Sequence, residues 1–355
     1  MKRFISIVLA AALMLSIACV SVSAVDVTDL TDGERALLMM QRADVNGDGQ
    51  YSTDDVSLVL KAAAGIIQIE NEEYYDIDLD GYVSVRDAQL MLEVVSGVGS
   101  VVSDEDTLAA FNTLINGVKN KKPGFEKTTT VVCPTIKVTS SGYSFPLTSL
   151  NVTNMEFGDY IVRAADLIEK FDANGEMVGE VAEMRESAVE VYKPQTETKT
   201  IVAGSNSHYT YFPVNNLGWA SKLTISDIKS IDYAVDGGVM VYTISMNDYT
   251  YNGSQYPTGT KGFSDRQNLP YGKVFNLPAL DDDDSSTINS VKLQKGKVIL
   301  KADLLTGNVI SVDYSYTYVS DITVVTEVES GSSTTTTTMR TVTTTNVSES
   351  FALNH

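Results

Sequence analysis

The hydrophobic pattern of the first hundred residues predicts helices. Apolar residues recur at helical spacing in three stretches, 32–43, 56–60 and 88–92. The last two stretches run into small residues closed by glycine, AAAG at 62–65 and VVSG at 94–97. Their similarity and their 32-residue offset indicate a compact tandem repeat.

Beyond residue 105 the pattern changes to a mixture of helix and strand. Helical spacing predicts helices from about 106 and over 158–171, while β-rich runs cover 127–138, 238–246 and 291–319. Glycines in QKGK (294–297) and LTGN (305–308) predict turns. The threonine-rich end, 334–350, reads either as a glycosylated linker or as the last strand of a β-hairpin, and we favour the hairpin. The fold class is therefore α+β, with a large antiparallel sheet in residues 106–355.

Two acidic loops precede the second and third helical stretches. DVNGDGQYSTDD (44–55) and DIDLDGYVSVRD (76–87) place oxygen-bearing side chains at loop positions 1, 3, 5, 9 and 12. Calcium prefers six to eight oxygen ligands and takes them from this spacing, with the backbone carbonyl of position 7 added. The predicted ligands are Asp44, Asn46, Asp48, Gln50, Ser52 and Asp55 in the first loop, and Asp76, Asp78, Asp80, Tyr82, Ser84 and Asp87 in the second.

Glycine and charge support a cation at each loop. Gly49 and Gly81 stand at position 6, where the chain must turn sharply. Two carboxylates about 5 Å apart repel by roughly 3 kcal/mol at an effective dielectric of 20. An acidic surface turn is the alternative, but it does not explain two copies in phase. We therefore predict two calcium ions.

Position 12 holds aspartate in both loops, where an ordinary EF-hand has a bidentate glutamate. Together with the sequences DVNGDG and DIDLDG and the tandem loop–helix units, this feature resembles the type I dockerin. The resemblance covers about residues 26–100. It implies calcium-dependent docking onto a cohesin domain of a cellulosome or similar bacterial cell-surface assembly, whose cargo commonly acts on polysaccharides.

The same resemblance places partner contacts at loop positions 10 and 11 and on the following helix. Those residues are Thr53, Asp54 and Lys61 in the first copy and Val85, Arg86 and Glu93 in the second. The charges of Asp54 and Lys61 are reversed at Arg86 and Glu93. We therefore predict one preferred docking orientation, where many dockerins have two.

The N-terminus predicts export from the cell. MKRF, an apolar run and VSA at 22–24 read as a signal peptide over residues 1–24. Lipoprotein processing at Cys19 is a poorer alternative, because serine stands three residues before it. These features divide the chain into signal peptide (1–24), dockerin (26–100), linker (101–105) and cargo domain (106–355). We therefore predict a secreted or cell-surface protein.

Composition limits the partners and the chemistry. With 46 acidic and 26 basic residues the formal charge is −20, which disfavours nucleic acid as a partner. A histidine-dependent catalytic triad would depend on His208 or the terminal His355, and no hydrolase motif surrounds His208. Trp219, the single tryptophan, argues against the usual carbohydrate platform, although Tyr314, Tyr316 and Tyr318 alternate along one predicted strand face.

We therefore expect a non-catalytic accessory cargo domain, with the three tyrosines either buried beneath a helix or exposed as a stacking strip. Two alternatives stay open. One is a carbohydrate-active hydrolase of an unrecognised family. The other is an adhesion or glycan-binding protein.

Overall fold

The computed structural model describes most of the chain after residue 28. The described residues are 29–69, 71–141, 150–152, 160–162, 165–171, 177–184, 195–207, 211–212, 221–257, 266, 268–275, 277, 280, 286–330 and 333–355. The predicted signal peptide with Cys19, and also His208, Trp219 and the acidic run 281–284, lie outside these residues. Among the helices described, none is long and apolar enough to cross a membrane.

Helices α2 (Asp32–Arg42), α3 (Thr53–Ala63) and α4 (Val85–Val95) form at the predicted places. Each begins with a capping box, in which a hydroxyl side chain and an acidic side chain three residues later satisfy free backbone N–H groups. In α3 and α4 these pairs are Ser52 with Asp55 and Ser84 with Asp87. Loop positions 9 and 12 therefore start the helix that follows each loop.

Helix α5 (Asp104–Lys121) confirms the helix predicted near residue 106 and connects the two parts of the chain. Ser103 caps its N-terminus, and it ends at Lys121, followed by the C-cap residue Lys122, whose φ of 45° is left-handed. Val101 and Val102, in the predicted linker, are buried. The segment before α5 is thus packed against the protein and is not a solvated tether.

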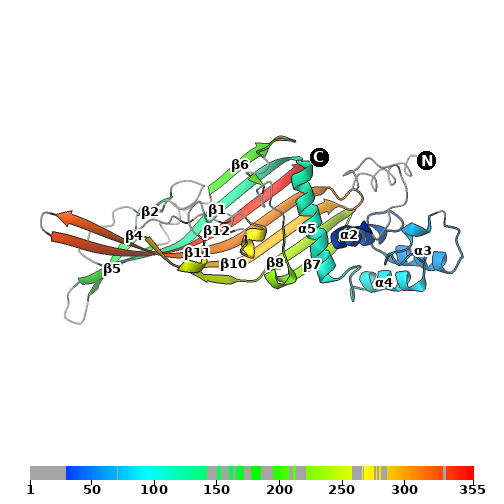
Figure 1. Cartoon of the computed structure of the whole chain (residues 1–355), viewed down its shortest axis with the longest axis horizontal. Coiled ribbons are helices and arrows are strands. Elements are labelled where there is room, and N and C mark those ends of the chain that lie inside the picture. Colours follow the sequence, from blue (N-terminus) through cyan, green and yellow to red (C-terminus); the bar gives the residue numbers. More distant parts are fainter. Residues whose placement is uncertain are drawn as a thin grey trace.

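The strands form one large antiparallel sheet with α5 across one face (Figure 1). In the described part of the chain it has ten strands, with the main order β4-β5-β1-β12-β11-β10-β8-β7, while β6 pairs with β1 and β9 with β10. The bounds are β1 (Gly124–Ser141), β4 (Ala165–Phe171), β5 (Met177–Met184), β6 (Gln195–Ile201), β7 (Ile228–Asp236), β8 (Val239–Met246), β9 (Tyr249–Asn252), β10 (Ser286–Asp303), β11 (Val309–Ser330) and β12 (Ser333–Asn354).

The threonine-rich end is a strand, as favoured above. β11 and β12 pair along nearly their whole lengths, from Ser311 opposite Ala352 to Ser330 opposite Ser333. This hairpin extends to the end of the molecule opposite α3 and α4 (Figure 1).

The helix predicted over 158–171 is wrong. This segment contains strands β3 (Tyr160–Val162) and β4, and β3 pairs with β2 (Leu150–Val152) in a separate two-stranded sheet. Short apolar runs fit a helix or a strand equally well, and here pairing of β4 with β5 supplies the backbone hydrogen bonds.

The turn predicted at QKGK is also wrong, because these residues lie inside β10. A register shift falls between Gln294 and Lys297, and Lys295 has a φ of 55°, which together form a β-bulge. Gly296 donates its N–H to the Tyr271 hydroxyl at 2.9 Å. A Cβ on Gly296 would lie 2.6 Å from the Tyr271 ring, so glycine is required here by close approach. The predicted turn at LTGN is confirmed between β10 and β11.

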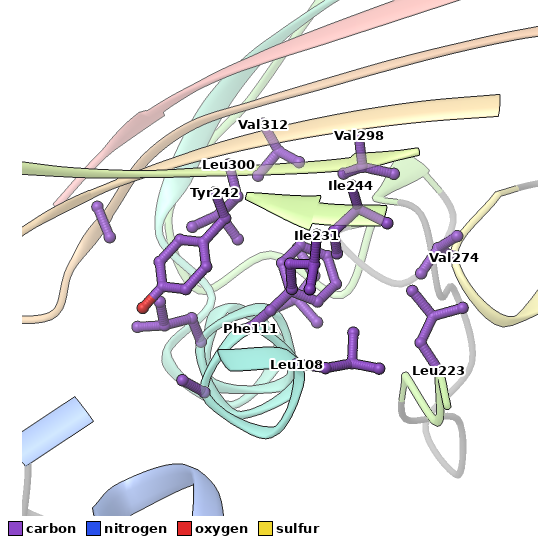
Figure 2. Close-up of a cluster of buried hydrophobic side chains, with 14 of the residues drawn as sticks. Leu108, Phe111, Leu223, Ile231, Tyr242, Ile244, Val274, Val298, Leu300 and Val312 are labelled. Carbon is purple, nitrogen blue, oxygen red and sulfur yellow. The ribbon is translucent and has the colours of Figure 1, made fainter. Parts of the chain in front are cut away.

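A continuous hydrophobic core joins the helices to the sheet. It runs from Ala36 and Met40 of α2 through Phe111 of α5 to Tyr242 of β8 and Val312 of β11. Figure 2 shows Leu108 and Phe111 of α5 pointing toward the side chains of the sheet.

The three alternating tyrosines belong to this core. Tyr314, Tyr316 and Tyr318 are all buried, so the exposed stacking strip is wrong. The aromatic cover over Tyr316 comes from Phe275 and from Tyr271 in the short 3₁₀ helix η6 (Tyr271–Lys273), with ring centroids 5.0 and 6.2 Å from that of Tyr316.

The contact of α2 with α5 depends on a glycine. A Cβ on Gly33 would overlap Thr113 and the backbone of Ala109 in α5. We expect Gly33→Ala to destabilise the protein by about 1–3 kcal/mol, because the helices must separate. Chemical unfolding of the full chain measures this change.

Gly117→Ala in α5 is the matched control. A Cβ at Gly117 meets nothing within 4 Å, so the better helix propensity of alanine should stabilise the protein by about 0.5–1 kcal/mol. Equal stabilisation by both substitutions would contradict the close packing of α2 on α5.

Candidate calcium loops and docking face

The two acidic loops share one backbone conformation. Gly49 and Gly81 at position 6 have φ angles of 85° and 92°. Position 4 is also left-handed in both loops, at Gly47 with 71° and at Leu79 with 61°. The non-glycine residue Leu79 in this region shows that the loop frame, more than residue preference, sets the conformation.

The carboxylate of position 1 accepts backbone hydrogen bonds inside each loop. Asp44 accepts from the N–H groups of Asp48 and Gly49 at 3.0 and 2.9 Å. Asp76 accepts from the equivalent N–H groups of Asp80 and Gly81 at 3.1 and 3.0 Å. The first carboxylate therefore shapes the turn around itself.

The carboxylate of position 12 closes the loop from the helix side. Asp55 accepts from the N–H groups of Asn46 and Ser52 at 3.1 and 2.9 Å. Asp87 accepts from Ile77 and Ser84 at 2.8 and 2.9 Å. Both carboxylates are fully buried. Aspartate suits this position because it bonds the loop backbone and the first turn of its helix at once.

The remaining predicted side-chain ligands lie on the same loops. In the second loop, carboxylate oxygens of Asp76, Asp78 and Asp80 lie within 4.8 Å of one another. In the first loop Asn46 replaces the middle carboxylate, and its amide nitrogen donates to Asp48 at 3.0 Å. Gln50 and Tyr82 stand at position 7. Their backbone N–H groups donate to the position 5 carboxylates of Asp48 and Asp80, at 2.9 Å in both loops.

Electrostatics favour a cation at both loops. Burial raises the pKa of Asp44 and of Asp76, and the nearby carboxylates of Asp55 and Asp87 raise them further. A divalent cation would relieve this cost by compensating the buried negative charge. An all-oxygen donor set of carboxylates, amide and carbonyls fits a hard cation such as calcium.

Residues 42–95 match the family model of the dockerin type I domain. This segment is a dockerin. Type I dockerins generally bind calcium, which agrees with the donor set, and the assignment supports docking onto a cohesin in an extracellular, cellulosome-type assembly. The family match ends before α5, and a comparison of the chain with curated proteins returns no match.

The predicted partner residues of the dockerin lie at the surface. Thr53, Asp54, Lys61, Val85 and Arg86 are exposed, and Glu93 is half-buried. The Arg86 Nε donates to Asp78 at 3.0 Å, which ties the second copy's position 11 to its own loop.

The dockerin also exposes apolar side chains that the sequence reasoning missed. Leu60 and Leu92 are equivalent in the two copies and are 43% and 51% exposed, while Tyr82 at position 7 is 75% exposed. Ile66 and Val98 form another exposed equivalent pair. The missed signal was the repeat itself, since an apolar residue kept at both copies but outside the helical core stripe indicates a contact surface.

Helix α2 is the second feature that sequence reasoning placed incompletely. The helical spacing over 32–43 predicted this helix but not its contacts, one of which is the hydrogen bond from Arg42 to the carbonyl of Asp76 at 3.0 Å. The buried face of α2, however, also lies against α5. Helix α2 therefore contacts both the dockerin and α5, the helix that lies across the sheet.

We expect the full chain to bind two calcium ions, one for each loop. Asp48→Ala and Asp80→Ala each remove an exposed carboxylate at position 5, so each variant should lose at least about tenfold in affinity at one site only. Calorimetric calcium titration measures both sites.

Asp54→Asn is the control for charge alone, since Asp54 is acidic and exposed but is not a predicted ligand. An equal loss in Asp54→Asn would mean that net charge, and not a specific loop, determines calcium affinity.

Proposed function

We propose that this protein is exported from the cell and docks through its calcium-loaded dockerin onto a cohesin domain of a cellulosome-like assembly. The single observation that carries the proposal is the matched frame of the two loops. In each loop the buried aspartate at position 1 shapes the turn and the one at position 12 completes the cap of α3 or α4, while Leu60 and Leu92 on the outer faces of these helices stay exposed.

The docking face is not symmetric. Leu60 and Leu92 are equivalent, but exposed Thr53 of the first copy corresponds to exposed Val85 of the second. Likewise Gln50 corresponds to Tyr82. Burial of apolar and aromatic side chains contributes most to protein interfaces, which supports one preferred orientation centred on the second copy.

Residues 106–355 serve as the cargo of this module. In our proposal they are an accessory domain carried to the assembly, and the burial of Tyr314, Tyr316 and Tyr318, the predicted stacking strip, supports this over sugar binding. The hydrolase and adhesion alternatives have no specific observation among the described residues in their favour.

Substitution at position 10 tests the orientation. Val85→Asp should weaken binding to a panel of type I cohesin domains by about a hundredfold, because a charge would be buried at an apolar contact. Thr53→Asp introduces the same charge at the equivalent position of the first copy and should change affinity by less than about threefold. Calorimetry in calcium measures both variants.

Chelation with EDTA is the control for calcium dependence, and it should abolish binding of the unmodified chain. Equal losses for Val85→Asp and Thr53→Asp would contradict a single orientation. Binding that survives chelation would contradict the proposed docking mechanism itself.

A further inference from the structure

We propose that the first calcium loop also anchors the dockerin on the sheet. Calcium at this loop would stabilise the packing of the dockerin on the β7–β8 turn, whereas calcium at the second loop would not. The inference rests on the calcium binding in the proposed function, and goes beyond docking to the internal organisation of the chain.

A backbone hydrogen bond links the first loop directly to the sheet. The N–H of Gly238, in the turn between β7 and β8, donates to the carbonyl of Gly49 at 2.8 Å. A Cβ on Gly49 would lie 2.6 Å from the Gly238 nitrogen. The carbonyl of Gly238 in turn accepts from the N–H of Leu304 at 2.9 Å, so the contact continues into the β10–β11 connection.

Tyr51, at loop position 8, makes the second link. Its hydroxyl donates to the carbonyl of Met40 and lies 2.7 Å from the hydroxyl of Tyr233 in β7. One loop side chain thus connects α2, the loop and the sheet.

The helix that leads into the first loop is held by the same part of the sheet. The Tyr242 hydroxyl of β8 donates to the Met40 sulfur at 3.1 Å. The Gln41 side-chain amide donates to the carbonyl of Leu304 at 2.7 Å. The end of α2 and residues 49–51 of the first loop are therefore both held against this part of the sheet.

The second loop has no equivalent of these links among the described residues. A Cβ added at Gly81, the counterpart of Gly49, meets nothing within 4 Å. Val83, the counterpart of Tyr51, lacks a hydroxyl. In Figure 1, α4 lies away from the sheet, beside α3, while α2 reaches α5. The chain itself therefore provides an internal comparison between a loop against the sheet and one outside it.

Calcium and the sheet act on the same backbone segment. Residues 49–51 lie between the ligand positions 5 and 9 and include Gln50, whose carbonyl is a predicted ligand. Two interactions that order one segment favour each other, and thermodynamic linkage makes the effect reciprocal. Weakening the contact with the sheet should therefore lower the calcium affinity of the first loop.

The reciprocal effect is tested with Tyr233→Phe, a change in the sheet that leaves every predicted ligand intact. In the Asp80→Ala background, where the first loop supplies the intact site, it should lower calcium affinity by about two- to tenfold, the range expected for one hydrogen bond. In the Asp48→Ala background, where the second loop is intact, affinity should not change. Tyr271→Phe, which removes a hydroxyl bonded to Gly296 instead, is the matched control and should leave both affinities unchanged.

The forward effect is tested by hydrogen exchange of the full chain. Chelation and Asp48→Ala should both increase exchange in the peptide containing Gly238, while Asp80→Ala should not. Unchanged hydrogen exchange of the Gly238 peptide in a chain that binds two calcium ions would overturn this inference and leave the docking proposal standing. A chain that binds no calcium would overturn both.

Discussion

The carboxylate at loop position 12 is the interaction on which the dockerin depends. In each copy a fully buried aspartate accepts hydrogen bonds from the loop backbone, and it also completes the capping box of the following helix. Buried carboxylates are costly unless they are hydrogen-bonded or paired with a cation. Loop closure and helix start therefore depend on the same side chain in each copy, which explains why the two copies have such similar geometry.

The dockerin is not an independent appendage in this protein. Helix α2 shares its buried face with α5, the residues before α5 include two buried valines, and the core continues from Ala36 into β11. Docking forces on α3 and α4 would pass to the sheet through packed side chains and not through a flexible tether. In the proposed docking mode the sheet would therefore have a fixed direction relative to the partner.

The two copies have diverged toward different surroundings. The first loop carries the tyrosine and the close glycine contact that fit it to the sheet, and the second carries exposed Tyr82 and Val85. This division gives a physical reason for loss of internal symmetry. If one copy packs on its own chain, the other is left to provide more of the apolar surface for a partner.

The sequence by itself determined what depends on local spacing. The turns at both loop glycines, the starts of α3 and α4 and the threonine-rich hairpin strand follow from residue type within a few neighbours. The tertiary structure alone decided three other features: that 158–171 forms strands, that QKGK is a bulge fitted around Tyr271, and that Tyr314, Tyr316 and Tyr318 are covered. Each depends on a pairing or packing partner outside the segment itself, namely β5, η6 and Phe275, which the periodicity of that segment does not contain. The backbone contact of Gly49 with Gly238 was likewise decided by the tertiary structure. These residues are far apart in the sequence, and glycine at the two positions is the only local sign of their contact.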